Sequence, residues 1–138
     1  MRTCTRKIEF DSAHRVMKHE SKCRHLHGHR YVAEITACSD SLDQLGRVID
    51  FSVLKTVVGG WIDEYLDHGT IANKEDLDLI SFCNNSGYKI FSMQGNPTAE
   101  NLSKLLFFKS QELVKPYGIS IKKIKLYETP NCWSEYGK

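Results

Sequence analysis

The sequence has no long apolar run, no cluster of basic residues and no strong excess of either charge. Lys and Arg total 19 and Asp and Glu total 17 among 138 residues, so the net charge of +2 does not favour a nucleic-acid partner. A membrane-spanning helix needs about 20 apolar residues in succession, and the charged start MRTCTRKIEF lacks the apolar centre of a secretion signal. We therefore expect a cytoplasmic protein with neither a membrane nor a nucleic acid as partner.

Cysteine pairs of the CxxC type are also lacking. The five cysteines are Cys4, Cys23, Cys38, Cys83 and Cys132, an odd number at irregular spacing. A disulfide framework needs paired cysteines and an oxidising compartment, so we expect free thiols in a reducing one. One of them can then have a chemical role, although the spacing alone does not identify it.

Repeats, low-complexity tracts and linker-like segments are absent as well. A chain of 138 residues has the length of one ordinary domain and can bury a hydrophobic core. We interpret residues 1–138 as a single domain.

Two segments alternate in the way that half-buried strands do. They are residues 6–15 and 27–37, joined by a loop of about a dozen residues, and they are expected to pair antiparallel. One face of the first carries Ile8, Phe10, Ser12 and His14, and one face of the second carries His27, His29, Tyr31, Ala33 and Ile35.

Helical spacing follows in two places. Residues 50–66 place apolar side chains on one stripe, and Asp50 can cap the first turn. The stripe consists of Phe51, Leu54, Val58, Trp61, Ile62 and Tyr65. Residues 96–114 repeat the pattern with Thr98 as the cap, whereas residues 69–87 are typical of a loop. We expect two helices separated by this loop.

The last part of the chain predicts a second pair of strands. Residues 118–128 (GISIKKIKLYE) favour a strand, and after a turn residues 132–136 (CWSEY) can return as a short one. The order is then ββααββ, which predicts an α+β domain with an antiparallel four-stranded sheet and two helices on one face. Such an open sheet has two edges that oligomerisation can cover.

The stretch CRHLHGH (23–29) holds the most conspicuous residues. His27 and His29 lie two apart on one side of a strand, and His14 lies in matching register on the partner strand. Three neutral imidazoles suit a catalytic Zn²⁺ and leave a fourth position for water or substrate. A cage that also used Cys23 and His25 is poor geometry, because ligands about 6.6 Å apart along one strand cannot all reach one ion. The alternative is a histidine-rich strand end without a metal.

Cys23 lies between two cationic residues, Lys22 and Arg24. Positive neighbours favour the thiolate form that a base or nucleophile needs. The alternative is a loop thiol without a chemical role.

Asp67 and His68 form a second candidate pair, within LDHG (66–69). Adjacent residues do not share a helix face, but near the end of a helix the two side chains can meet, or one can meet Cys23. The alternative is that His68 only interacts with the dipole at the helix C-terminus.

A resemblance to a known family rests on six segments taken together. They are FDSAH (10–14), CRHLHGH (23–29), VIDF (48–51), LDH (66–68), NPTAENL (96–102) and YETP with WSEY (127–130 and 133–136). In this order they resemble the 6-pyruvoyltetrahydropterin synthase family, and within it the bacterial branch of 6-carboxy-5,6,7,8-tetrahydropterin synthases. The segments cover nearly the whole chain.

The resemblance implies the tunnelling fold (T-fold), in which the sheets of several subunits join into a barrel. It also implies a homo-hexamer, a dimer of trimers with active sites at the subunit interfaces. Zinc would be held by His14, His27 and His29, while His19 and His25, outside the matched pattern, are predicted not to be ligands.

The same resemblance assigns further roles. It makes Cys23 the catalytic cysteine, assisted by Asp67 and His68 of a neighbouring subunit. Glu128 matches the glutamate that anchors the pterin ring, a task that suits a carboxylate because it accepts two hydrogen bonds. For Thr98 and Glu100 we expect structural roles, a helix cap and a first-turn charge.

The implied substrate is 7,8-dihydroneopterin triphosphate. The short C-x₃-HGH spacing resembles the carboxy-forming enzymes of queuosine (7-deazapurine) biosynthesis, carbon-carbon lyases that release acetaldehyde and triphosphate. Two alternatives stay open: a pyruvoyl-forming synthase, which eliminates triphosphate and keeps the side chain, and a non-catalytic oligomer stabilised by zinc.

Overall fold

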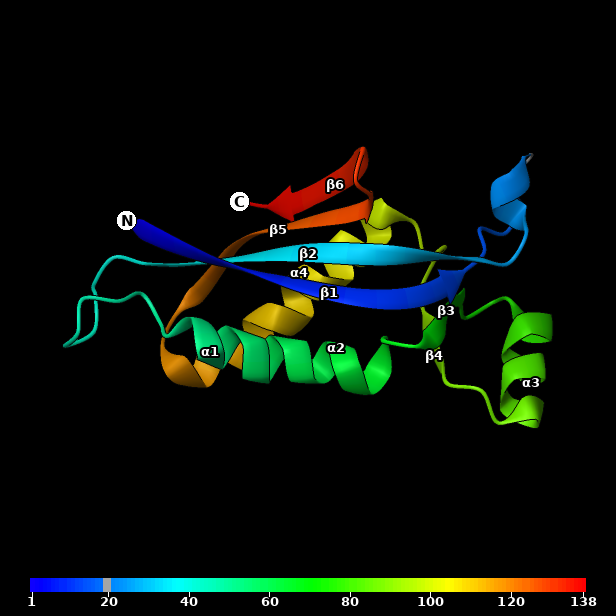
Figure 1. Ribbon diagram of the computed structural model, residues 1–138, viewed down its shortest axis with the longest axis horizontal. Coiled ribbons are helices and arrows are strands. Elements are labelled where there is room, and N and C mark those ends of the chain that lie inside the picture. The colour runs from blue at the N-terminus through cyan, green and yellow to red at the C-terminus, as the bar shows by residue number, and fades with distance from the viewer. Residues whose placement is uncertain (19–20) are drawn as a thin grey trace.

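Six strands form one mixed sheet in the computed structural model, which describes residues 1–18 and 21–138. The strand order is β4-β3-β1-β2-β5-β6 (Figure 1). The strands are β1 (Arg2–His14), β2 (His27–Ser39), β3 (Gly69–Asn73), β4 (Ile90–Met93), β5 (Ser120–Thr129) and β6 (Cys132–Gly137). Neighbours among β1, β2, β5 and β6 pair antiparallel, whereas β3 runs parallel to both β1 and β4. The α+β class and both hairpins are confirmed, but the sheet has six strands rather than four.

The first hairpin follows the alternation of its sequence. In its register His14 lies opposite His27, and Ser12 lies opposite His29. The apolar residues of the predicted inner face are buried, including Phe10, while His27 and His29 are half-buried. Two strands of 13 residues each thus carry the histidines to one end of the sheet.

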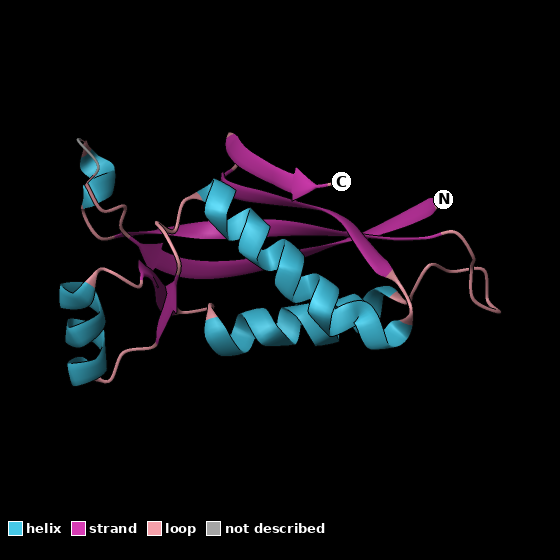
Figure 2. Cartoon of the chain, turned by 180° about the vertical axis from the view of Figure 1, so that it is seen from behind, coloured by secondary structure: helices cyan, strands magenta, loops and turns pink. Residues whose placement is uncertain are grey.

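Two helical segments cover the inner face of the sheet (Figure 2). The first is a continuous run of α1 (Phe51–Leu54), a π-helical turn (Lys55–Gly59) and α2 (Gly60–Tyr65). The second is α4 (Ala99–Val114), followed by a short 3₁₀ turn (Lys115–Tyr117). Both predicted caps are confirmed, because Asp50 accepts from the Ser52 amide and Thr98 from the Asn101 amide.

The π-helical turn changes which side chains of the first helix face the core. Phe51 and Tyr65, predicted to lie on the buried stripe, are 52% and 42% exposed, whereas Leu66 is fully buried. A π turn holds more residues than an α turn, so it rotates the stripe expected from a spacing of 3.6. Gly59 ends this turn and is buried against Ile8 of β1.

The interpretation of residues 69–87 as a loop was wrong. They form β3 and α3 (Leu77–Ser86), which lie with β4 at one end of the molecule (Figure 1). Asp76 caps α3 by accepting from the Leu79 amide, and Gly87 ends it with φ of +72°. Asn84, Asn85 and Ser86 form the last turn of this helix, and Gly87 is its glycine stop.

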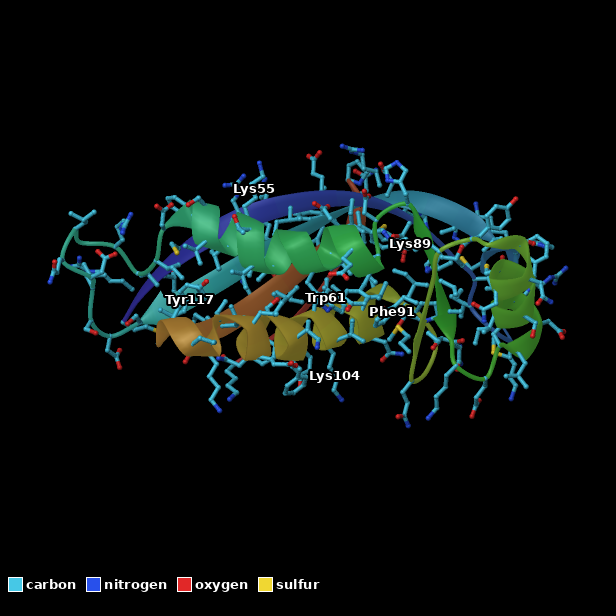
Figure 3. The ribbon with its side chains drawn as sticks, turned by 90° about the horizontal axis from the view of Figure 1, so that it is seen from below. Lys55, Trp61, Lys89, Phe91, Lys104 and Tyr117 are labelled. Carbon is cyan, nitrogen blue, oxygen red and sulfur yellow. The ribbon has the colours of Figure 1, made fainter. Side chains whose placement is uncertain are left out.

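The main core lies between the helices and the sheet. Its fully buried side chains include Tyr31, Ile35, Leu54, Ile62, Leu102, Leu106, Ile124 and Leu126. Figure 3 shows Trp61 between α2 and α4, where its ring lies 5.6 Å from the Lys109 ammonium. None of the helices formed by the described residues is long and apolar enough to span a membrane.

Candidate active site

The three predicted metal ligands lie together at the end of the first hairpin. His14 is the last residue of β1, and His27 and His29 begin β2. The three ring centroids are 4.7 to 5.0 Å apart, and the atoms that can bind a metal lie within 4.8 Å of one another. Strand pairing alone therefore assembles the cluster.

Hydrogen bonds to carbonyl groups fix how two of these rings are protonated. His14 Nδ1 lies 2.7 Å from the Pro97 carbonyl oxygen, and His27 Nδ1 lies 2.7 Å from that of His25. A carbonyl only accepts, so in the neutral form of each ring the proton lies on Nδ1 and the lone pair on Nε2. The two Nε2 atoms face each other at 3.2 Å. Two lone pairs at that distance repel unless a cation lies between them.

His29 completes the cluster with a third unpaired nitrogen. Its Nε2 is buried and makes no hydrogen bond to any described residue, although a Glu128 carboxylate oxygen lies 3.4 Å away. Burial lowers the pKa of both His14 and His29, which favours the neutral imidazoles that metals bind. The donor set fits a zinc ion with an open fourth position.

Cys23 lies next to this cluster. It belongs to a short 3₁₀ turn (Lys22–Arg24) between β1 and β2, and its carbonyl accepts a hydrogen bond from the Val16 amide at 3.0 Å. Cys23 borders a cavity of about 190 Å³ that His14 and Glu128 also line. Thus the cysteine, one metal ligand and the predicted pterin anchor share one cavity.

Asp67 and His68 form a hydrogen-bonded pair at the turn between α2 and β3. His68 Nδ1 donates to Asp67 Oδ2 at 2.8 Å, and Asp67 Oδ1 accepts from the Asp11 amide at 2.9 Å. Burial acts to raise the pKa of Asp67, but the hydrogen bonds from Asp11 and His68 lower it below its usual range. His68 takes a left-handed φ of +58°, an uncommon conformation outside glycine that is often found at functional sites.

Of this pair, His68 borders a different cavity from that of Cys23. The second cavity measures about 550 Å³, and none of its lining residues lines the first. His68 is 78% exposed there, near Arg30, Tyr88 and Lys89. The structure of one chain therefore does not bring Cys23 and the Asp67–His68 pair together.

Several contacts of the site were not predicted from the sequence. The Tyr31 hydroxyl lies 3.2 Å from His14 Nδ1, which also donates to the Pro97 carbonyl. Glu100, expected only as a first-turn charge, lines the Cys23 cavity. His25 contributes only its carbonyl oxygen to the cluster, and His19 lies outside the described residues.

Comparison with known proteins decides the family. A sequence model described as "6-pyruvoyl tetrahydropterin synthase" matches residues 3–138. The chain belongs to the 6-pyruvoyl tetrahydropterin synthase family. A relative from Rickettsia felis named 6-carboxy-5,6,7,8-tetrahydropterin synthase is 46% identical, over 96% of this chain and 97% of the relative. A protein of the same name from Haemophilus influenzae is 31% identical over 96% of each chain. The assignment to this enzyme family made from the sequence is confirmed.

Solved structures of low sequence identity confirm the T-fold. An uncharacterized protein from Wolinella succinogenes superposes with a TM-score of 0.86 at 22% identity, covering 99% of this chain and 98% of its own. The 6-pyruvoyl tetrahydropterin synthase of Caenorhabditis elegans gives a TM-score of 0.71 at 21% identity, covering 99% and 94%. Both similarities extend over the whole domain.

Proposed function

We propose that the chain is a zinc-dependent 6-carboxy-5,6,7,8-tetrahydropterin synthase of queuosine biosynthesis. It would convert 7,8-dihydroneopterin triphosphate to 6-carboxy-5,6,7,8-tetrahydropterin and release acetaldehyde and triphosphate. The observation that carries this proposal is the convergence of three imidazoles with unpaired nitrogens beside Cys23 and Glu128. The names of relatives up to 46% identical support the choice of product.

Each residue has a role that its surroundings support. His14, His27 and His29 would hold a zinc ion, which when bound supplies a Lewis acid that polarises substrate hydroxyls and acidifies the neighbouring C–H bonds. Cys23 as thiolate would remove a proton from the carbon that faces its cavity. Glu128 would accept hydrogen bonds from the 2-amino and N3–H groups of the pterin ring.

The Asp67–His68 pair would move protons on the other side of the substrate. Because Asp67 holds the Nδ1–H of His68, the Nε2 of that ring is free to accept a proton and to return it. The Asp11 amide fixes the aspartate in turn, so the ring is oriented before substrate arrives.

We further propose that the complete site forms between chains in a cytoplasmic homo-hexamer, a dimer of trimers. The Cys23 cavity of about 190 Å³ is smaller than pockets for small molecules, commonly about 300–1,000 Å³. Beyond its three-residue pairing with β3, β1 has no strand on that side among the described residues. A second chain can cover that open edge and place its Asp67–His68 pair opposite Cys23.

Mass spectrometry of the products tests this function. Zinc-loaded protein and its Cys23→Ala variant are incubated with 7,8-dihydroneopterin triphosphate. Carboxytetrahydropterin and acetaldehyde from the parent alone support the proposal. Pyruvoyltetrahydropterin would instead make the chain a pyruvoyl-forming synthase, and unchanged substrate with zinc bound would favour a non-catalytic oligomer.

A further inference from the structure

The side chain of Asn96 holds Met17, which lies in the segment that follows β1 and its last residue, His14. Asn96 Oδ1 accepts from the Met17 amide at 3.0 Å, and Asn96 Nδ2 donates to the Met17 carbonyl at 3.2 Å. One side-chain amide therefore pairs both polar groups of Met17, in the manner of a strand partner. The two residues lie 79 positions apart in the sequence.

Asn96 is itself fixed on three sides. Its Oδ1 also accepts from the Asn73 side chain at 3.2 Å, and its carbonyl oxygen accepts from the Asn101 side chain at 2.9 Å and the Thr98 amide at 2.8 Å. These partners belong to the end of β3, the first turn of α4 and its cap. Asn96, whose side chain bonds to Met17, is thus held by residues of a strand and a helix and not by another loop.

The clamp reaches the cysteine through one further bond. Val16, the neighbour of Met17, donates its amide to the Cys23 carbonyl at 3.0 Å. On the other side of Asn96, the Pro97 carbonyl accepts from His14 Nδ1. Pro97 therefore holds a predicted metal ligand directly, and Asn96 holds Met17, whose neighbour Val16 bonds to the backbone of the predicted catalytic cysteine.

We propose that Asn96 is a positioning residue for Cys23. Through Met17 and Val16 it keeps Cys23 beside the cavity shared with His14 and Glu128. A shift of about 1 Å at a reacting group can cost on the order of 100-fold in rate, so a bidentate clamp at this point has a kinetic effect. The inference rests on the proposed catalytic role of Cys23.

The decisive variant is Asn96→Asp, which has the same shape but cannot donate to the Met17 carbonyl. The matched control is Asn85→Asp, which adds the same charge at an exposed position of α3. Alkylation by iodoacetamide is followed for each cysteine by peptide mass spectrometry, and the exposed Cys132 serves as internal reference. Turnover, KM and bound zinc are measured on the same samples.

In Asn96→Asp we expect Cys23 to react about fivefold faster relative to Cys132, because the freed segment exposes the thiol. The kcat should fall about tenfold while KM changes by less than about threefold, as for a group that acts mainly in the transition state. Bound zinc should stay as in the parent, and Asn85→Asp should match the parent in every measurement.

Unchanged Cys23 alkylation and unchanged kcat in Asn96→Asp would overturn the proposal, even if thermal stability fell. If that variant does not fold, Asn96→Ser replaces it, and loss of fold in both would also overturn it, since Asn96 would then support the whole domain. Alkylation needs no substrate. A parent that forms no carboxytetrahydropterin therefore refutes the proposed function and still leaves the clamp to be decided.

Discussion

The three predicted metal ligands stand on two paired strands, whereas the three predicted proton-transfer groups stand on turns. On the strands, register sets the position of each imidazole, and carbonyl groups orient two of the three rings. On the turns, Asp67 and His68 bond to the distant backbone of Asp11. The carbonyl of Cys23 accepts from the nearby Val16 amide. The three imidazoles are thus brought together within one chain. The proposed acid–base groups depend instead on turn anchors and, in the proposed hexamer, on assembly.

Removal of a predicted metal ligand on a strand should have the broadest effect, because both bound zinc and activity are lost. We expect His27→Ala to lose zinc and activity by more than the ~10–100-fold that loss of an outer hydrogen-bond partner costs. Zinc per chain is measured by elemental analysis after dialysis. His25→Ala is the control, because His25 is exposed and offers the cluster only its backbone oxygen. If His27→Ala binds as much zinc as the parent, His27 is not a metal ligand and the predicted metal centre is wrong.

The second prediction concerns Cys23 and His68, which lie on turns. It tests whether one active site combines these residues from two chains. Cys23→Ala and His68→Ala should each lose on the order of 10²–10⁴-fold in kcat with zinc retained. If each site combines one chain's cysteine with another chain's histidine, hexamers reassembled from equal amounts of the two variants should regain about a quarter of the parent activity. Activity is measured before and after mixed refolding.

A site built within one chain gives the opposite result, because no chain in the mixture carries both groups. The mixture would then stay as inactive as its components. Each variant unfolded and refolded by itself is the control for any activity gained through refolding alone.

The part of the fold that the sequence predicted is the part with long periodic segments. Alternation over β1 and β2 identifies the inner face and places the three histidines of the predicted metal site, because a period of two leaves one register that buries the apolar side. β3 and β4 have five and four residues, too few for a clear period. The helix α3 buries only Leu79 and Cys83, although Asp76 and Gly87 marked its two ends.

The same division holds for the site. Asp67 and His68 were found as a pair, but nothing in the sequence connects them with the Asp11 backbone, more than 50 residues away. Asn96 bonds to backbone groups, which every residue possesses, so its partner leaves no mark in the sequence. Contacts of side chains with distant backbone emerge only once the chain is folded.

A moderate effect is expected for the ion pair that anchors the segment after β1. Arg15 donates to both carboxylate oxygens of Asp76, whose side chain is 4% exposed, and this lowers the pKa of Asp76. Arg15→Gln should lower the free energy of unfolding by about 1–3 kcal/mol at pH 7, less than the ~3–5 kcal/mol of a fully buried pair. The measurement is urea denaturation of both proteins.

The pH dependence of this difference has a definite sign. Because the folded pKa of Asp76 lies below the unfolded value of about 3.9, the stabilisation is complete above about pH 5 and is lost as the pH falls through the folded pKa. The gap between parent and Arg15→Gln should therefore be constant from pH 7 to about pH 5 and shrink below about pH 4. A gap that grows in acid would contradict the assignment.

The smallest effect is expected at the turn that carries His68. Lys89 Nζ donates to the carbonyls of Asp63 and Asp67, at 2.7 and 2.6 Å, and so caps the end of α2. We expect Lys89→Met to lower the free energy of unfolding by about 1 kcal/mol and kcat several-fold, with bound zinc unchanged. Lys104→Met is the control, since Lys104 projects from α4 into solvent (Figure 3). Equal turnover in the two variants would mean that the Asp67–His68 turn keeps its geometry without the lysine.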